Sequence, residues 1–105
     1  MELAFDSERL RSICEDQSLA TQEVGSEVAE ALKRRLADLR AANSITDLLA
    51  GHPRVIAEHL VIDLGMGYSL TLQANHPRNP VNAEGGLNWT IVSRLKVLRI
   101  DRNDD

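Results

Sequence analysis

Residues 59–73 read HLVIDLGMGYSLTLQ, and they carry the strongest indication of the fold class. Leu60, Ile62 and Leu64 alternate with Val61 and Asp63, and Tyr68, Leu70 and Leu72 alternate with Ser69 and Thr71, which is the period of a β-strand with one buried face. Between the two runs, Gly65-Met66-Gly67 has the composition of a tight turn. The stretch therefore predicts an antiparallel hairpin of His59–Leu64 and Tyr68–Gln73.

The residues before the hairpin predict one short strand and two helices. The strand is expected at Glu2–Phe5 and the first helix at Glu8–Glu15, with a turn at Asp16-Gln17-Ser18. From Thr21 to Arg40, apolar residues recur every three or four positions, which predicts one long amphipathic helix. Gly25 is the weak point of that helix, because glycine disfavours a helix interior.

Three further segments complete the predicted organisation. A helical turn is expected at Ile45–Ala50, residues 74–88 form a long irregular stretch, and a last strand spans about Arg94–Asp101. The irregular stretch is either a mobile functional loop or a tolerated insertion. Because helices come before strands, we expect one α+β domain over residues 1–105. Two N-terminal helices would pack on one face of a small, mainly antiparallel sheet.

Composition excludes several classes of protein. The chain has 105 residues, 43% hydrophobic and 27% charged, with a formal net charge of −4 and three aromatic residues, a balance that does not favour nucleic-acid binding. No apolar run approaches the roughly 20 residues of a membrane span. The acidic N-terminal residues do not resemble a signal peptide. We therefore expect a cytoplasmic protein that does not act at a membrane. Cys14 is the single cysteine, so it has no partner for an internal disulfide.

Few residues suggest chemistry without further context. His52, His59 and His76 match no metal-binding spacing, so neither a metal nor another cofactor is expected. Cys14 lies on the apolar stripe of the first helix and is expected to be a small buried hydrophobic residue.

A group of basic residues occupies the second half of the long helix, at Lys33, Arg34, Arg35 and Arg40. The group is either a solvated helix face or a surface that contacts RNA or the acidic residues of a partner protein.

Several segments together resemble the RelE/HigB-like toxins of the RelE/ParE superfamily. Residues 34–42 (RRLADLRAA) and 43–48 (NSITDL) are similar to the basic helix and following turn of that family, R-L-x-x-L-x-x-A and then S-L-x-D-L. Residues 5–16 resemble the start of the family, and residues 67–70 (GYSL) its G-x-Y-R-L strand. Residues 87–89 (LNW) are similar to a D-W step found in one branch. The resemblance covers most of the chain and implies a RelE-like fold.

The resemblance also implies a function. Members are the toxin halves of bacterial toxin–antitoxin pairs, and typical members cut messenger RNA on the ribosome without a metal. The ribose 2′-OH attacks the adjacent phosphate while basic and tyrosine side chains assist. The implied partners are a cognate antitoxin, the ribosome and messenger RNA. The implied catalytic residues are Tyr68, His59 and Arg54, and the implied RNA-binding residues are Arg94, Lys96, Arg99, Lys33 and Arg34.

These residues also have structural interpretations. Tyr68 would be a core or rim aromatic residue of its strand. The three basic residues of the last strand would protect an exposed sheet edge against aggregation.

The sequence departs from the family at positions where the family's catalytic residues are expected. Ser69 replaces the arginine of Y-R-L, the basic segment before the hairpin is missing, and the end expected to read D-Y-H reads Asp101-Arg102-Asn103. Serine offers no bidentate fork to a phosphate. Two hypotheses follow, beside a third that no residue selects, a DNA-directed function as in the gyrase-inhibiting relatives of this superfold. The chain is a toxin with a weakened or lost endonuclease site, or it is a catalytically silent module that binds an antitoxin or forms a homodimer through an exposed edge strand.

Overall fold

The predicted hairpin is the centre of the sheet in the computed structural model, which describes residues 1–103. Strands β3 (His59–Gly65) and β4 (Tyr68–Ala74) are antiparallel, with Leu60 opposite Leu72 and Ile62 opposite Leu70. All four side chains are buried on the same face. The alternation in the sequence therefore predicted both the strands and the face that they bury.

The sheet has five strands within residues 1–103, in the order β1-β5-β4-β3-β2. Strand β5 (Arg94–Arg102) is antiparallel to β4, and β1 (Glu2–Phe5) pairs with β5 in parallel. The predicted first and last strands are confirmed, as is the mainly antiparallel α+β class. Since β5 lies between β1 and β4, its basic residues do not protect a sheet edge.

Strand β2 (Arg54–Ile56) was not predicted. It is antiparallel to β3 and connects to it through a two-residue turn, Ala57-Glu58, in which both residues have positive φ angles of 49° and 67°. Glycine, asparagine and aspartate are the usual residues at such positions. The sequence therefore carries no local signal for this turn.

The helical half contains three helices in the described residues, where two were expected. Helix α1 (Glu8–Glu15) is confirmed at its predicted bounds. The predicted turn at residues 16–18 is wrong, because Asp16 caps α2 (Gln17–Val24) by accepting hydrogen bonds from the amides of Ser18 and Leu19. The single long helix is also wrong. Gly25 adopts a φ of 87° and separates α2 from α3 (Ser26–Ala41).

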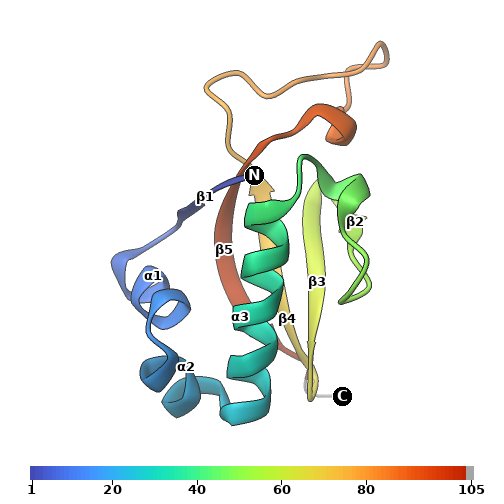
Figure 1. The fold of residues 1–105 in the computed structure, drawn as a ribbon. Helices are drawn as coiled ribbons and strands as arrows, with labels where there is room; N and C mark the ends of the chain where they lie inside the picture. Colours follow the sequence, from blue (N-terminus) through green and yellow to red (C-terminus); the bar gives the residue numbers. More distant parts are fainter. Residues whose placement is uncertain (104–105) are drawn as a thin grey trace.

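Helix α3 packs across the sheet and provides most of the helical side of the core (Figure 1). Its residues Val28, Leu32, Leu36 and Leu39 are at most 2% exposed. They face a layer contributed by β3, β4 and β5, made of Leu60, Ile62, Leu70, Leu72, Leu95 and Val97. Burying such side chains stabilises the fold by roughly 1.5–3 kcal/mol each.

The segments at the upper end of α3 in Figure 1 are mostly irregular. The expected helical turn at residues 45–50 is shorter, a single 3₁₀ turn η1 (Ile45–Asp47), and a second, η2 (Trp89–Ile91), precedes β5. Residues 75–88 are irregular apart from a bridge between Val81 and Leu87, and extend beyond the sheet (Figure 1). The N-terminal ammonium group of Met1 donates hydrogen bonds to the carbonyl oxygens of Leu39 and Ala42, which end α3.

Candidate functional site

The sheet face opposite α3, called the open face here, carries most of the residues that the family resemblance selects. It consists of the strand residues that alternate with the core residues. They are Glu2 and Ala4 of β1, Arg94, Lys96, Arg99 and Asp101 of β5, Ser69, Thr71 and Gln73 of β4, His59, Val61 and Asp63 of β3, and Arg54 and Ile56 of β2.

Arg54 and His59 both belong to the open face but have different surroundings. The Arg54 guanidinium donates through Nη1 to the Asp63 carboxylate and to the His52 carbonyl oxygen, both at 3.0 Å. His59 lines a small polar hollow of about 180 Å³ with Gln73 and Asn79. Asp63 therefore neutralises the arginine that would have to stabilise a phosphate.

Tyr68 lies on the other face of the sheet and at the other end of the hairpin. It shares the side of Leu70 and Leu72, packs half-buried against the core, and has the Arg102 guanidinium 5.6 Å from its ring centroid. His59 lies beside Gln73, five residues along β4 from Tyr68, which corresponds to about 17 Å of strand. The structure thus brings Arg54 and His59 to one face and leaves Tyr68 apart from them.

The basic residues of β5 are paired with acidic residues. Arg94 Nε lies 2.9 Å from Glu2, Lys96 Nζ lies 3.4 Å from Asp6, and Arg99 Nε lies 2.9 Å from Asp101. The partners of Arg94 and Lys96 are about 90 residues away in the sequence and reach them through the parallel pairing of β1 with β5. These pairs are partly exposed and contribute only about 0–1 kcal/mol each to stability. They nevertheless balance the positive charge of the open face.

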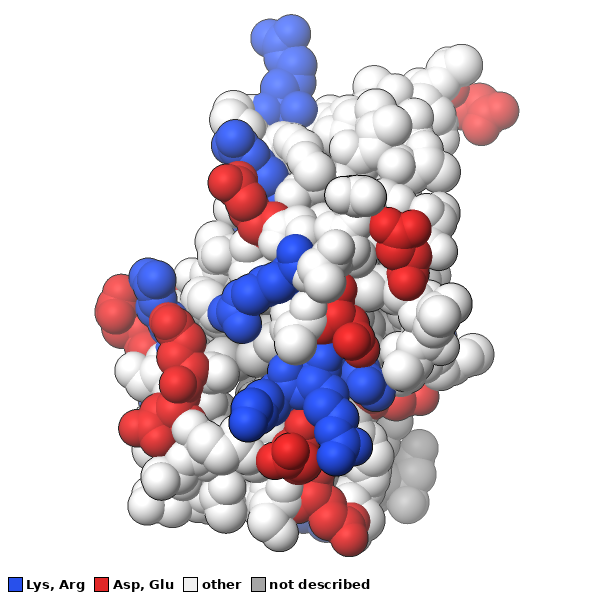
Figure 2. All heavy atoms as spheres, in the orientation of Figure 1, with Lys and Arg blue, Asp and Glu red and all other residues white. Residues whose placement is uncertain are grey.

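The basic residues of α3 have a different environment. Lys33, Arg34 and Arg40 are exposed, and within residues 1–103 none of them lies within 4 Å of a carboxylate oxygen. Figure 2 shows Lys and Arg side chains gathered over the α3 side of the molecule, with Asp and Glu side chains around them. These three side chains are therefore exposed cations without an ion pair in the described part of the chain, which is compatible with a solvated helix face and with a surface that binds a partner.

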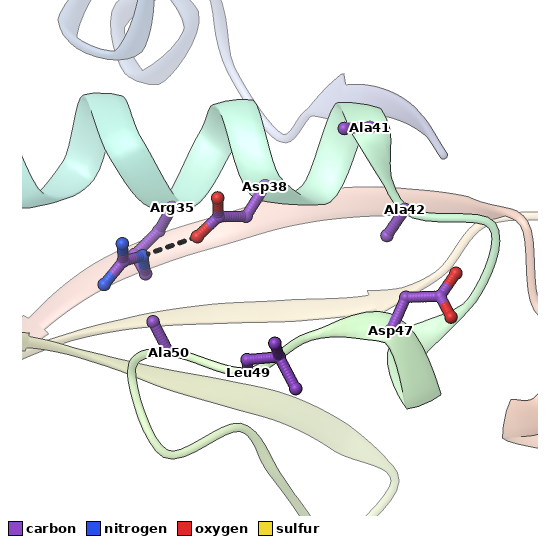
Figure 3. Close-up of a pocket in the computed structure, with 7 residues that line it drawn as sticks. All are labelled: Arg35, Asp38, Ala41, Ala42, Asp47, Leu49 and Ala50. Carbon is purple, nitrogen blue, oxygen red and sulfur yellow. Dashed lines mark hydrogen bonds and ion pairs between the residues drawn. The ribbon is translucent and has the colours of Figure 1, made fainter.

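A groove lies between the C-terminal half of α3 and the segment that follows η1. It has a volume of about 500 Å³ and is lined by Arg35, Asp38, Ala41, Ala42, Asp47, Leu49 and Ala50 (Figure 3). Arg35 Nε and the Asp38 carboxylate form an ion pair of 3.0 Å on its α3 side. Leu49 is 94% exposed at its rim.

The sequence analysis did not identify this groove. The sequence did contain an indication of it. Leu48 and Leu49 are adjacent in a short turn that can bury only one of them, so the other is expected to form an exposed apolar surface. Leu48 packs against the core and Leu49 remains in solvent.

Two other observations concern ligands and membranes. The described residues contain no group of three or more His, Cys, Asp and Glu side chains that could hold a metal ion. Within residues 1–103, the helices are too short or too polar to cross a lipid bilayer.

Cys14 is half-buried rather than fully buried, and burial raises the pKa of its thiol to about 11. Because only the thiolate reacts, we expect Cys14 at pH 8 to react with Ellman's reagent about 100-fold more slowly than an unfolded peptide thiol. The rate should rise about tenfold per pH unit and level off near pH 11, whereas a plateau near pH 9 would contradict the shift. The unfolded thiol ionises at a lower pH than the folded one. The raised pKa of Cys14 therefore lowers the free energy of unfolding as the pH rises from about 9 to about 11.

Comparison with known proteins gives one structural similarity. No protein-family model and no curated protein matches the sequence. A chain of the solved structure described as "Chromosomal ParDE TA system from P. aeruginosa" is similar to this chain with a TM-score of 0.47 and 15% sequence identity. The match covers 99% of this chain and 97% of that chain.

Proposed function

We propose that this chain is the toxin-type member of a toxin–antitoxin pair, and that it acts by binding a protein partner, its antitoxin, without cleaving RNA. The resemblance of residues 34–48 and 67–70 to RelE/HigB-like toxins supports the toxin–antitoxin assignment. The observation that carries the loss of cleavage is the separation of Tyr68 from His59 and Arg54.

Geometry is the first reason. Metal-independent RNA cleavage needs a base near the 2′-OH, an acid near the leaving oxygen and positive charge on the phosphate between them. Each must lie within about 3 Å of its target. Two groups about 17 Å apart along a strand and on opposite faces cannot meet at one phosphate. Tyr68 is therefore assigned here to packing against the core and Arg102.

Charge is the second reason. Affinity for RNA comes largely from cations that replace the counterions of phosphates. On the open face, Arg54, Arg94, Lys96 and Arg99 each have a carboxylate partner. The face therefore presents no excess positive charge to a nucleic acid.

The competing function is a ribosome-dependent messenger RNA endonuclease. One observation favours it: Arg54, His59, Lys96 and Arg99 lie together on the open face. The phosphates of a bound RNA could replace the exposed carboxylates that now pair with the basic side chains. In that case His59 and Arg54 would act on the phosphate, and Arg94, Lys96 and Arg99, with Lys33 and Arg34, would bind the RNA.

Expression of the chain alone in a bacterial culture distinguishes the two functions. We expect normal growth with soluble protein present, and no new messenger RNA 5′ ends when these are mapped in the same cells, because the catalytic groups do not converge. New ends inside translated frames would contradict the proposal. They would establish the endonuclease if they disappear in His59→Ala and Arg54→Ala variants and persist in an Arg78→Ala control, whose side chain lies on the irregular segment.

A further inference from the structure

The charge of the chain is distributed unevenly along the sequence. Residues 33–50 hold four basic and two acidic residues, a net charge of +2. The remainder holds eight basic and fourteen acidic residues, a net charge of −6. The positive segment is the second half of α3 together with η1 and the far wall of the groove. An acidic partner is therefore attracted to this region and repelled by the rest of the molecule.

Arg35 lines the groove but is paired with Asp38, and among the unpaired cations of α3 only Arg34 lies on the groove side of the helix. Residues four and seven positions apart share a helix face, so Arg34 lies in one row with Asp38 and Ala41, which line the groove. The two carboxylates that line the groove are already engaged. Asp38 pairs with Arg35, and Asp47 accepts a hydrogen bond of 2.9 Å from the amide of Asn43. Arg34 has no such partner within the described residues, so it is available to a carboxylate from another molecule.

The floor of the groove is apolar. Ala41, Ala42 and Ala50 leave space because their side chains are small, and the exposed Leu49 stands on the side opposite α3 (Figure 3). An aliphatic side chain placed between them would bury Leu49, the most exposed of the large apolar residues in the described chain. The groove contains no aromatic side chain on which a nucleobase could stack, which favours a protein segment over RNA as its occupant.

We propose that this groove binds an acidic segment of the partner protein, with an aliphatic side chain against Leu49 and the three alanines and a carboxylate on Arg34. The inference rests on the proposed function, in that it locates the surface on which the partner of that proposal docks. Lys33 and Arg40 lie on the other side of α3 and contribute through the field of the helix face, while Arg34 makes the direct contact.

A selection from a phage-displayed library of random 15-residue peptides tests the proposal on the full chain. We expect enriched peptides to contain an excess of Asp and Glu and at least one large aliphatic residue. Bound peptides should shift the NMR amide signals of Ala41, Leu49 and Ala50. Arg34→Glu and Leu49→Ser should each weaken binding of the enriched peptides about tenfold or more. Both residues are exposed, so the variants are expected to fold.

Matched controls separate these contacts from general charge and general apolarity. Arg78→Glu reverses an exposed cation without an ion pair in the described residues, and Val81→Ser removes an exposed apolar side chain. Both should leave binding unchanged. Enriched peptides that are basic, or binding that responds equally to the controls, would overturn the proposal.

The possible failures differ in meaning. Peptides that bind but shift signals of the open face or of β2 would overturn the groove and leave partner binding intact. An absence of any enriched peptide would count against both the groove and the proposed function. Binding of a 12-nucleotide RNA that is lost in Arg34→Glu, without peptide binding, would assign the helix face to nucleic acid and overturn the proposal.

Discussion

Replacing Leu36 by alanine is expected to lower the free energy of unfolding by about 3–4 kcal/mol, which corresponds to a fall in melting temperature of about 15 °C. Leu36 is 1% exposed and belongs to the row of α3 that packs on the sheet. The substitution removes buried methyl groups and leaves a cavity between two regular elements, neither of which can easily move into it. Thermal unfolding followed by circular dichroism measures the change.

Leu49→Ala is the matched control for Leu36→Ala. It makes the same chemical change at a side chain that is 94% exposed, so the free energy of unfolding should change by no more than about 0.5 kcal/mol. Similar losses at both positions would show that α3 is not packed on the sheet as described. A small effect at Leu36 with a large effect at Leu49 would place the groove segment in the core instead.

Gly51→Ala is expected to destabilise the fold by about 2–4 kcal/mol. Gly51 has a φ of 83°, and a Cβ added there would lie 2.5 Å from Cγ2 of Ile62 and 3.0 Å from Cδ of Arg35. The backbone cannot retreat freely, because the Gly51 carbonyl oxygen accepts a hydrogen bond of 2.6 Å from the amide of Asp63. Ile62 is buried and also has little room to move. Denaturant unfolding gives the change in free energy.

Gly85→Ala separates the two causes of that loss. Gly85 has a similar φ of 89° but nothing within 4 Å of an added Cβ, so only the conformational cost of about 1 kcal/mol applies. The excess loss at Gly51 therefore measures the close approach of the segment after η1 to β3 and α3. Equal losses at the two glycines would show that this approach is not enforced. The wall of the groove would then be free to shift.

Local sequence patterns predicted the elements whose signals are local. The bounds of β1 and α1 follow from alternation and from the Ser7 cap, whose side chain accepts a hydrogen bond from the Leu10 amide. The hairpin of β3 and β4 follows from the two alternating runs around a glycine turn. Each of these signals lies within a few residues of the structure that it specifies, so no tertiary information was needed.

The prediction of one long helix was wrong because the apolar spacing continues across the point where the helix ends. The apolar spacing from residue 21 to residue 40 continues across Gly25, although the backbone there leaves the helical conformation. Helix α2 contributes the buried Ala20 to the core, and α3 contributes the buried residues from Val28 onward. The chain changes direction at Gly25, so that α2 packs back against α3. The spacing of apolar residues does not show where such a change of direction occurs.

The candidate site shows the same division between sequence and structure. Sequence patterns alone predicted the hairpin, the core face of β1, β3 and β4 and the positive charge of residues 33–50, because composition and alternation are properties of neighbouring residues. Three other features appear only once the chain is packed: Arg94 pairs with Glu2, Tyr68 lies apart from His59, and Leu49 faces a groove beside α3. These facts depend on register, on strand order and on contacts between residues far apart in the chain. The charge of each side chain and the spacing of apolar residues can therefore be read from the sequence. The residues that these side chains contact are set only when the sheet and α3 pack together.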